Sequence, residues 1–219
     1  MPFTAEQFFA VFAAYNQAIW PLQIVACLAG LLAVAFLLRP SRGAGQGIAT
    51  VLALFWAMNG LGYHWTWFAP INPVARLFAA AFVAEAVLLA LAPVLFRELR
   101  FSVRADARSW LGLALIAYAL VLYPALGALA GHSWPEVPVF GVAPCPTVIF
   151  TIGMLLLAPW RAARWLLVVP VLWSAVGGSA ATLLGVPQDY GLIVAGLVAL
   201  AVALGHRFRA GFARHGEPA

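Results

Sequence analysis

A series of apolar runs, most of them about 17 to 23 residues long, fills the chain and constrains its fold more than any other feature. Runs of this length match the thickness of a bilayer when they are helical. Lipid accommodates only helices or closed barrels, and barrel strands would alternate in polarity, which these runs do not. Because 65% of the residues are hydrophobic and 9% are charged, the sequence predicts an all-α, polytopic membrane helix bundle.

The apolar runs predict seven transmembrane helices in a single domain over residues 1–219. Their expected positions are 21–38, 48–68, 73–96, 110–130, 146–159, 165–184 and 190–205. The fifth would be only about 21 Å long, which is short for a bilayer. A short interfacial helix is expected in residues 1–18, where Thr4 and Gln7 have the spacing of a capping box.

The segments between the runs are polar, glycine-rich or proline-rich. We expect inner turns at residues 39–47 and 160–164 and a basic tail at 206–219. Residues 131–145 form the longest outer connection and contain three prolines. This connection either lies flat on the bundle or dips back into a protein-lined cavity.

Arginine placement orients the predicted bundle. With the N-terminus outside and the C-terminus in the cytoplasm, the arginines that fall inside are 39, 42, 97, 100, 104, 108, 161, 164, 207, 209 and 214. Only Arg76 falls outside, as the positive-inside bias requires. The net charge of +5 therefore reflects topology, and no basic module is large enough to predict nucleic-acid binding.

Glu85 is the most informative polar residue of the sequence. It lies twelve residues from Pro73 and twelve from Arg97, which places it near the middle of a bilayer. An acid at this depth is costly, so Glu85 should face the bundle interior, either as a neutral hydrogen-bonded acid or in a binding or proton-coupling role. Arg76 lies on the opposite face of the same helix and is a poor partner. We expect Asn59 to bond Glu85.

A polar site around Glu85 is the main functional hypothesis. Asn59, Tyr63 and Thr66 form one stripe at α-helical spacing, which ordinary interhelical hydrogen bonding would also explain. Thr151 and Ser174 fall at a comparable depth on other helices. His64 lies about 140° from the stripe and is expected in the interface. The predicted substrate-binding residues are Glu85, Asn59, Tyr63, Thr151 and Ser174.

Cys145 is the weaker candidate for chemistry. Prolines at 144 and 146 fix the backbone around it, and the following helix N-terminus would favour a thiolate or an anion. A soft metal could bind Cys145 together with Cys27, Met58 or Met154, but no spaced Cys/His set supports this, and a proline-shaped helix start is the favoured explanation of the segment. His132 and Glu136 could join an outer site. The chain has no lysine, which excludes Schiff-base chemistry.

Several strings resemble an uncharacterised family of bacterial multi-pass membrane proteins. They are residues 1–9, Asn16, Trp20-Pro21, residues 59–65, Ile71-Asn72-Pro73 and residues 143–147. The resemblance covers nearly the whole chain and implies a multi-pass protein of the bacterial inner membrane. It implies no activity, substrate or catalytic residue.

The function that the sequence favours is a small-molecule or ion transporter built around Glu85. The alternatives are a membrane-embedded metal, redox or enzymatic protein that uses Cys145, and a non-catalytic sensor or assembly subunit. An enzyme is the less favoured reading, and no cofactor is predicted. The expected partners are membrane lipid and a small substrate, and self-association stays open.

Overall fold

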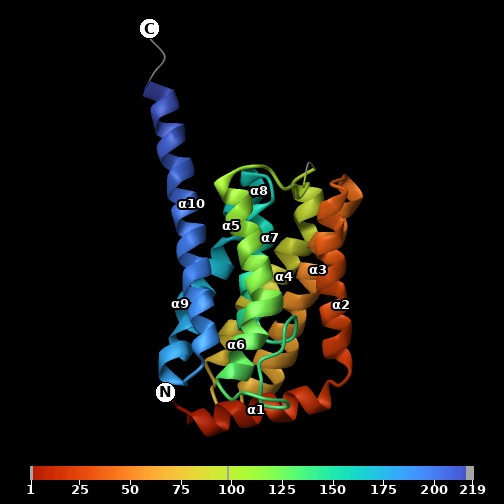
Figure 1. The fold of residues 1–219 in the computed structure, drawn as a ribbon, viewed down its shortest axis with the longest axis vertical. Coiled ribbons are helices and arrows are strands. Elements are labelled where there is room, and N and C mark those ends of the chain that lie inside the picture. The colour runs from red at the N-terminus through yellow and green to blue at the C-terminus, as the bar shows by residue number, and fades with distance from the viewer. Residues whose placement is uncertain (1, 98, 216–219) are drawn as a thin grey trace.

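The computed structural model describes residues 2–97 and 99–215, and its regular structure in these ranges is helical throughout. The chain forms an upright bundle (Figure 1). The long segments of the bundle are α2 (Leu22–Ala35), α3 (Arg42–Ala57), α4 (Ala75–Leu95), α5 (Ala107–Ala117), α7 (Pro144–Leu156), α9 (Val168–Leu183) and α10 (Tyr190–His215). Shorter helices α6 (Tyr123–Leu129) and α8 (Trp160–Leu166) join them, as do the 3-10 turns η1 (Phe36–Leu38) and η4 (Pro187–Asp189). The π-helical segments η2 (Met58–Phe68) and η3 (Tyr118–Leu122) continue α3 and α5.

Four helical segments of the described chain are long and apolar enough to cross a membrane. They are Arg42–Phe68, Ala75–Leu95, Ala107–Leu129 and Pro187–His206, and the number rises to six if two bent pairs each count as one span. The bent pairs are α1 with α2 and η1, at 86°, and α8 with α9, at 41°. The described chain is therefore an all-α bundle with four to six candidate membrane spans, which is compatible with a membrane protein.

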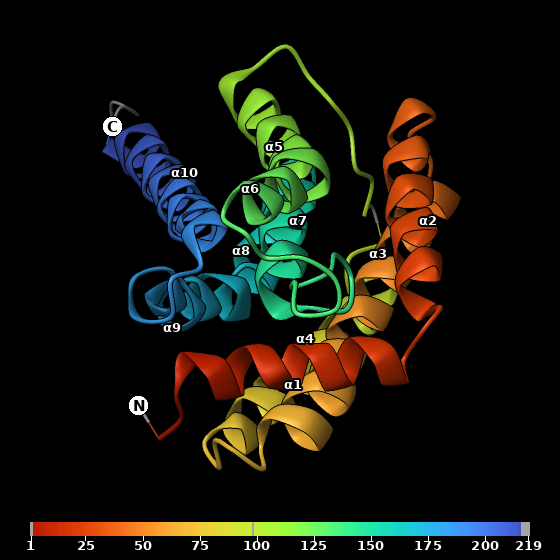
Figure 2. The same ribbon diagram turned by 60° about the horizontal axis from the view of Figure 1, so that its bottom comes forward.

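Helix α1 (Ala5–Ala18) crosses one end of the bundle at nearly a right angle, as Figure 2 shows. The predicted capping box is present: the Gln7 N–H donates to Thr4 Oγ1, and the Thr4 N–H donates to Gln7 Oε1. The apolar face of α1, with Phe8, Phe12 and Tyr15, is buried against the bundle. The predicted N-terminal helix thus exists and covers the end of the bundle, and its position in the membrane interface stays a prediction.

Helix boundaries differ from expectation at the arginine-rich end. Ser41 caps α3 by accepting from the Ala44 N–H, so the expected turn over residues 39–47 is helical from Arg42. Helix α8 begins directly after Pro159, so the expected turn over residues 160–164 is also helical. Helix α10 continues to His215 through most of the expected tail, and residues 216–219 lie outside the described residues.

Helix α7 lies at the centre of the bundle, where all but one of its 13 residues are buried. Close contact with α5 depends on two glycines, because a Cβ at Gly153 would lie 2.8 Å from the Gly112 carbonyl oxygen. Arg108 completes the far end of α7: its Nη2 donates to the carbonyls of Ala158 at 2.6 Å and Leu155 at 3.2 Å. A cation at this position also complements the dipole of α7.

The connection over residues 131–143 folds back into the bundle from the end covered by α1 (Figure 1). Asn16 holds its first part by donating to the carbonyls of Pro135 at 2.7 Å and Val137 at 2.8 Å. The Tyr15 hydroxyl donates to the Val142 carbonyl at 3.0 Å. Residues 140–143 are buried, so α7 begins inside the protein, which explains how the short predicted fifth span is accommodated.

Candidate functional site

Asn59 is fully buried, but it does not bond Glu85. Its Nδ2 donates to the Phe55 carbonyl at 2.8 Å and to the Gly141 carbonyl at 3.2 Å, and lies 3.4 Å from Thr147 Oγ1. The predicted Asn59–Glu85 hydrogen bond is therefore wrong. Asn59 instead fixes the inward end of the 131–143 connection beside the start of α7.

The π-helical geometry of η2 explains why the predicted polar stripe holds for Asn59 and Tyr63 but is wrong for Thr66. The Ala69 N–H donates to the His64 carbonyl, five residues earlier. A π-helical segment has more residues per turn than an α-helix, so the residues that share one face of η2 do not follow the α-helical spacing. Asn59, Tyr63 and His64 consequently share the buried face, whereas Thr66 is exposed. His64, expected in the interface, has no exposed surface at all.

Glu85 faces the interior, as expected, and is fully buried. Neither of its carboxyl oxygens has a hydrogen-bond partner within residues 2–97 and 99–215. Phe82 lies one turn away on the same buried face of α4, and its ring centroid is 4.7 Å from His64 and 5.0 Å from Trp173. Glu85 therefore lies one helical turn behind a wall of aromatic rings.

Two of those rings, His64 and Trp173, line a cavity of about 180 Å³ between α1, η2, α4, α9 and the start of α7. Its aromatic residues are Phe3, Phe8, Phe12, Tyr63, His64, Phe68, Phe78 and Trp173, with Asn72 and Cys145 among its polar ones. None of the residues that line it is charged at neutral pH if His64 is neutral. An engineered apolar cavity of about 150 Å³ holds benzene, so this cavity has room for a small organic ligand.

Three side chains of the cavity, those of Tyr63, His64 and Trp173, present buried polar atoms without hydrogen-bond partners among the described residues. The Tyr63 hydroxyl and both His64 ring nitrogens are buried and make no hydrogen bond within the described part of the chain. Buried polar atoms are nearly always paired, because leaving one unpaired costs about 1 to 3 kcal/mol. Unpaired atoms that converge on one cavity indicate a place where a ligand or water completes the bonding.

A second acid, Asp189, is buried behind the cavity at the start of α7. The Tyr123 hydroxyl donates to its Oδ1 at 2.6 Å, and the Cys145 thiol lies within hydrogen-bonding reach of its carboxyl group. The N-terminus of α7 favours negative charge nearby. Sequence reasoning missed Asp189 because it falls in a short turn between apolar runs; the pair Gln188-Asp189 directly before a run was the available signal.

The remaining predicted residues lie elsewhere. Thr151 accepts from Trp56 Nε1 at 2.9 Å and donates to the Thr147 carbonyl at 2.8 Å. Ser174 donates to the Pro170 carbonyl of its own helix at 2.9 Å. Of the five predicted binding residues, Tyr63 alone lines the cavity, and Glu85 lies behind its wall.

The cysteines Cys27 and Cys145 are both free. Within the described ranges, no group of three or more His, Cys, Asp or Glu side chains is placed to hold a metal ion. The Cys145 thiol lies beside the Asp189 carboxyl group and the Trp173 side chain, whereas thiol enzymes pair the cysteine with a base such as histidine. His132 packs against Phe9 with ring centroids 4.7 Å apart, and Glu136 is exposed.

The chain is an all-α bundle with helices apolar enough to cross a membrane, and it has a small aromatic cavity beside two buried acids. The chain belongs to a family of unknown function, DUF6064, whose family model matches residues 5–214. Curated proteins and solved structures give no match to this chain.

Proposed function

We propose that the protein is a small-molecule transporter of the bacterial inner membrane, and that it carries a small organic cation in exchange for a proton. It crosses the membrane seven times, with the N-terminus and the aromatic cavity outside and the arginine-rich end in the cytoplasm. The arginine distribution supports this orientation. The cavity lies beside α1, at the end opposite the segment Arg100–Arg108.

The observation that carries the proposal is the aromatic cavity in front of the buried acids. Aromatic faces attract organic cations, and the attraction strengthens when the site is desolvated. The lining contains no arginine and no lysine that would repel a cation. Asp189 lies close enough to Tyr63 to interact with it electrostatically, so the cavity is next to a negative or hydrogen-bonding group.

Glu85 supplies the coupling in this proposal. An unpartnered carboxylate is costly at this depth, so Glu85 carries a proton when the site is empty. A cation that moves past the Phe82 ring would replace that proton. Glu85 with a proton bound and Glu85 with the cation bound both have no net charge, so the interior would stay neutral. A buried acid of this kind is typical of proton-coupled carriers.

Binding of matched ligands tests the proposed function. Purified protein is titrated with choline and with 3,3-dimethylbutan-1-ol, a neutral compound of the same shape, and tryptophan fluorescence is followed. We expect choline to bind at least about tenfold more tightly, because only the cation gains from the rings. Equal affinity for the two compounds, or binding of neither, contradicts the proposal.

Two tryptophan variants localise the binding. Trp173→Leu removes a ring of the cavity, whereas Trp110→Leu removes a ring that is 63% exposed on the bundle surface. Choline affinity should fall in the first variant and stay unchanged in the second. Uptake of choline into vesicles, driven by an outward proton gradient, then separates a transporter from a receptor that binds the same ligand.

A further inference from the structure

Two further cavities meet at the arginine-rich end of the bundle, and Trp160 lines both of them. The first has a volume of about 320 Å³ and lies between the segment from Arg100 to Ser109, the end of α7 and α10. The second has a volume of about 490 Å³ and is a groove between α8, α9 and α10. Neither shares a residue with the aromatic cavity.

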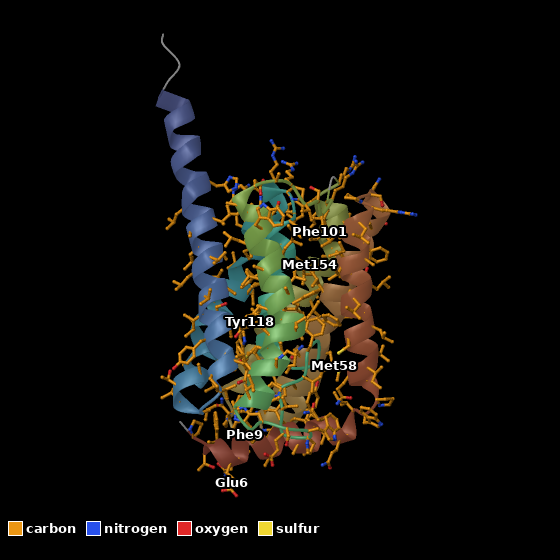
Figure 3. All side chains as sticks on the ribbon, viewed as in Figure 1. Glu6, Phe9, Met58, Phe101, Tyr118 and Met154 are labelled. Atoms are coloured by element: carbon orange, nitrogen blue, oxygen red, sulfur yellow. The ribbon has the colours of Figure 1, made fainter. Side chains whose placement is uncertain are left out.

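The first cavity is basic. Arg100, Arg104 and Arg108 line it, and Asp106 is the acid among the residues of the lining. Asp106 is already engaged, since its Oδ1 accepts the Ser109 N–H at 2.8 Å. Nitrogen atoms gather at this end of the bundle, near Phe101 in Figure 3. The cavity is about ten times larger than the roughly 30 Å³ of a water molecule, so it has room for an anionic group.

Arg108 occupies a special position in the basic cavity. Its Nη2 is bound to two carbonyls at the end of α7, and its Nε is buried without a hydrogen-bond partner among the described residues. Its guanidinium carbon lies 5.6 Å from the centre of the Trp160 ring. A fixed guanidinium with a spare N–H suits the oxygen of a phosphate group.

The second cavity is apolar apart from one cation. Its lining is Trp160, Arg164, Trp165, Leu167, Val168, Val171, Leu172, Ala199, Leu200 and Ala203. Leu172 and Leu200 are 64% and 46% exposed, so the groove opens to the surroundings of the bundle. The Trp160 ring stacks on His206 with centroids 4.3 Å apart and lies where the groove and the basic cavity adjoin.

We propose that one anionic phospholipid binds across both cavities, with its phosphate among the arginines and an acyl chain in the groove. A free phosphate ion would use the basic cavity alone, whereas the continuous apolar groove matches a hydrocarbon chain. Trp160 lies at the junction, where the headgroup meets the chains, a depth at which tryptophan is common. This site is independent of the proposed transport of cations.

Native mass spectrometry of the full-length protein tests the lipid site. The protein is titrated with phosphatidylglycerol, with phosphatidylcholine of the same chain length and with inorganic phosphate. We expect phosphatidylglycerol to be retained roughly tenfold more than phosphatidylcholine, and phosphate not to be retained. If phosphate is retained as strongly as phosphatidylglycerol, the proposal of a lipid site is overturned and the basic cavity is a site for phosphate alone.

Paired variants test the two halves of the site. R100Q/R104Q should weaken phosphatidylglycerol retention roughly tenfold, and R39Q/R42Q, which removes the same charge outside both cavities, should not. Ala203→Trp fills the groove and should also weaken retention, whereas Ala201→Trp lies on an exposed face of α10 and should not. Equal losses within each pair would show unspecific surface attraction or unspecific damage and overturn the proposal.

Discussion

The aromatic cavity and the arginine-rich end of the bundle treat their buried polar groups in opposite ways. Around the cavity, Tyr63, His64 and Glu85 carry buried polar atoms with no hydrogen-bond partner in the described ranges. At the arginine-rich end, Asp106 accepts the Ser109 N–H at the start of α5 and Arg108 donates to two carbonyls at the end of α7, which are backbone groups that helix termini leave open. A paired group stabilises the fold, whereas an unpaired one lowers stability and is retained where it meets a ligand. Among the described residues, unpaired atoms therefore gather at the aromatic cavity, whereas at the arginine-rich end the groups that close helix termini are paired and the Arg108 Nε is left unpaired beside the proposed lipid site.

Glu85→Gln gives the largest expected effect on function. The amide keeps the shape of the side chain but cannot release a proton, so proton-driven uptake of choline into vesicles should fall to background. Thermal stability should stay the same or rise, because no hydrogen bond of Glu85 is lost. Uptake at the wild-type rate would remove Glu85 from the coupling.

Arg108→Gln gives the largest expected effect on stability. The change removes two charge-assisted bonds to the end of α7 and should lower the free energy of unfolding by about 2 to 4 kcal/mol. Denaturation in mixed micelles measures it. Arg161→Gln removes an exposed arginine at the same end and serves as the control. If both variants lose the same free energy of unfolding, the loss comes from removing a positive charge and not from removing the hydrogen bonds that cap α7.

Tyr63→Phe should separate binding from stability at the aromatic cavity. The hydroxyl has no partner among the described residues, so its removal should change the free energy of unfolding by less than about 0.5 kcal/mol. Choline binding should weaken about fivefold if this hydroxyl contacts the ligand. Tyr123→Phe is the comparison, because it removes a 2.6 Å bond to Asp189 and should be destabilising. Similar losses of stability in the two variants would contradict the difference between an unpaired Tyr63 hydroxyl and a paired Tyr123 hydroxyl.

The smallest expected effect concerns the pH dependence of the cap on α5. The Ser109 N–H, which bonds the carboxylate, lowers the pKa of Asp106 below its ordinary value of 3.8, and the Ser109 hydroxyl and nearby arginines add to this. The stabilisation is therefore complete above pH 3.8 and is lost as the pH falls through the lowered pKa. Asp106→Asn keeps a capping oxygen at every pH. The melting temperatures of the wild type and of Asp106→Asn should approach each other below about pH 4. A difference that stays constant with pH would contradict a stabilising role of the Asp106 carboxylate as the cap of α5.

Local chemistry predicted much of the bundle. The capping box of Thr4 and Gln7, the burial of Glu85 and the unsuitability of Arg76 as its partner follow from spacing along one helix. Arg76 is exposed and lies over the Trp65 ring at 5.8 Å. The wrong expectations for His64 and Thr66 arose where the helical spacing changed. In η2 the π-helical repeat turned His64 inward and Thr66 outward, and an α-helical projection could not show this.

The sequence by itself determined that this is an apolar helix bundle with an acid in its interior and arginines at helix ends and in the segments between the long helices, because burial and topology follow from composition and charge placement. The tertiary structure alone decided which polar groups meet. The 131–143 connection folds inward and takes the bonds of Asn59, and Asp189 is buried against Tyr123, 66 positions away. Such contacts depend on how distant segments pack, and no local pattern encodes the distance between them.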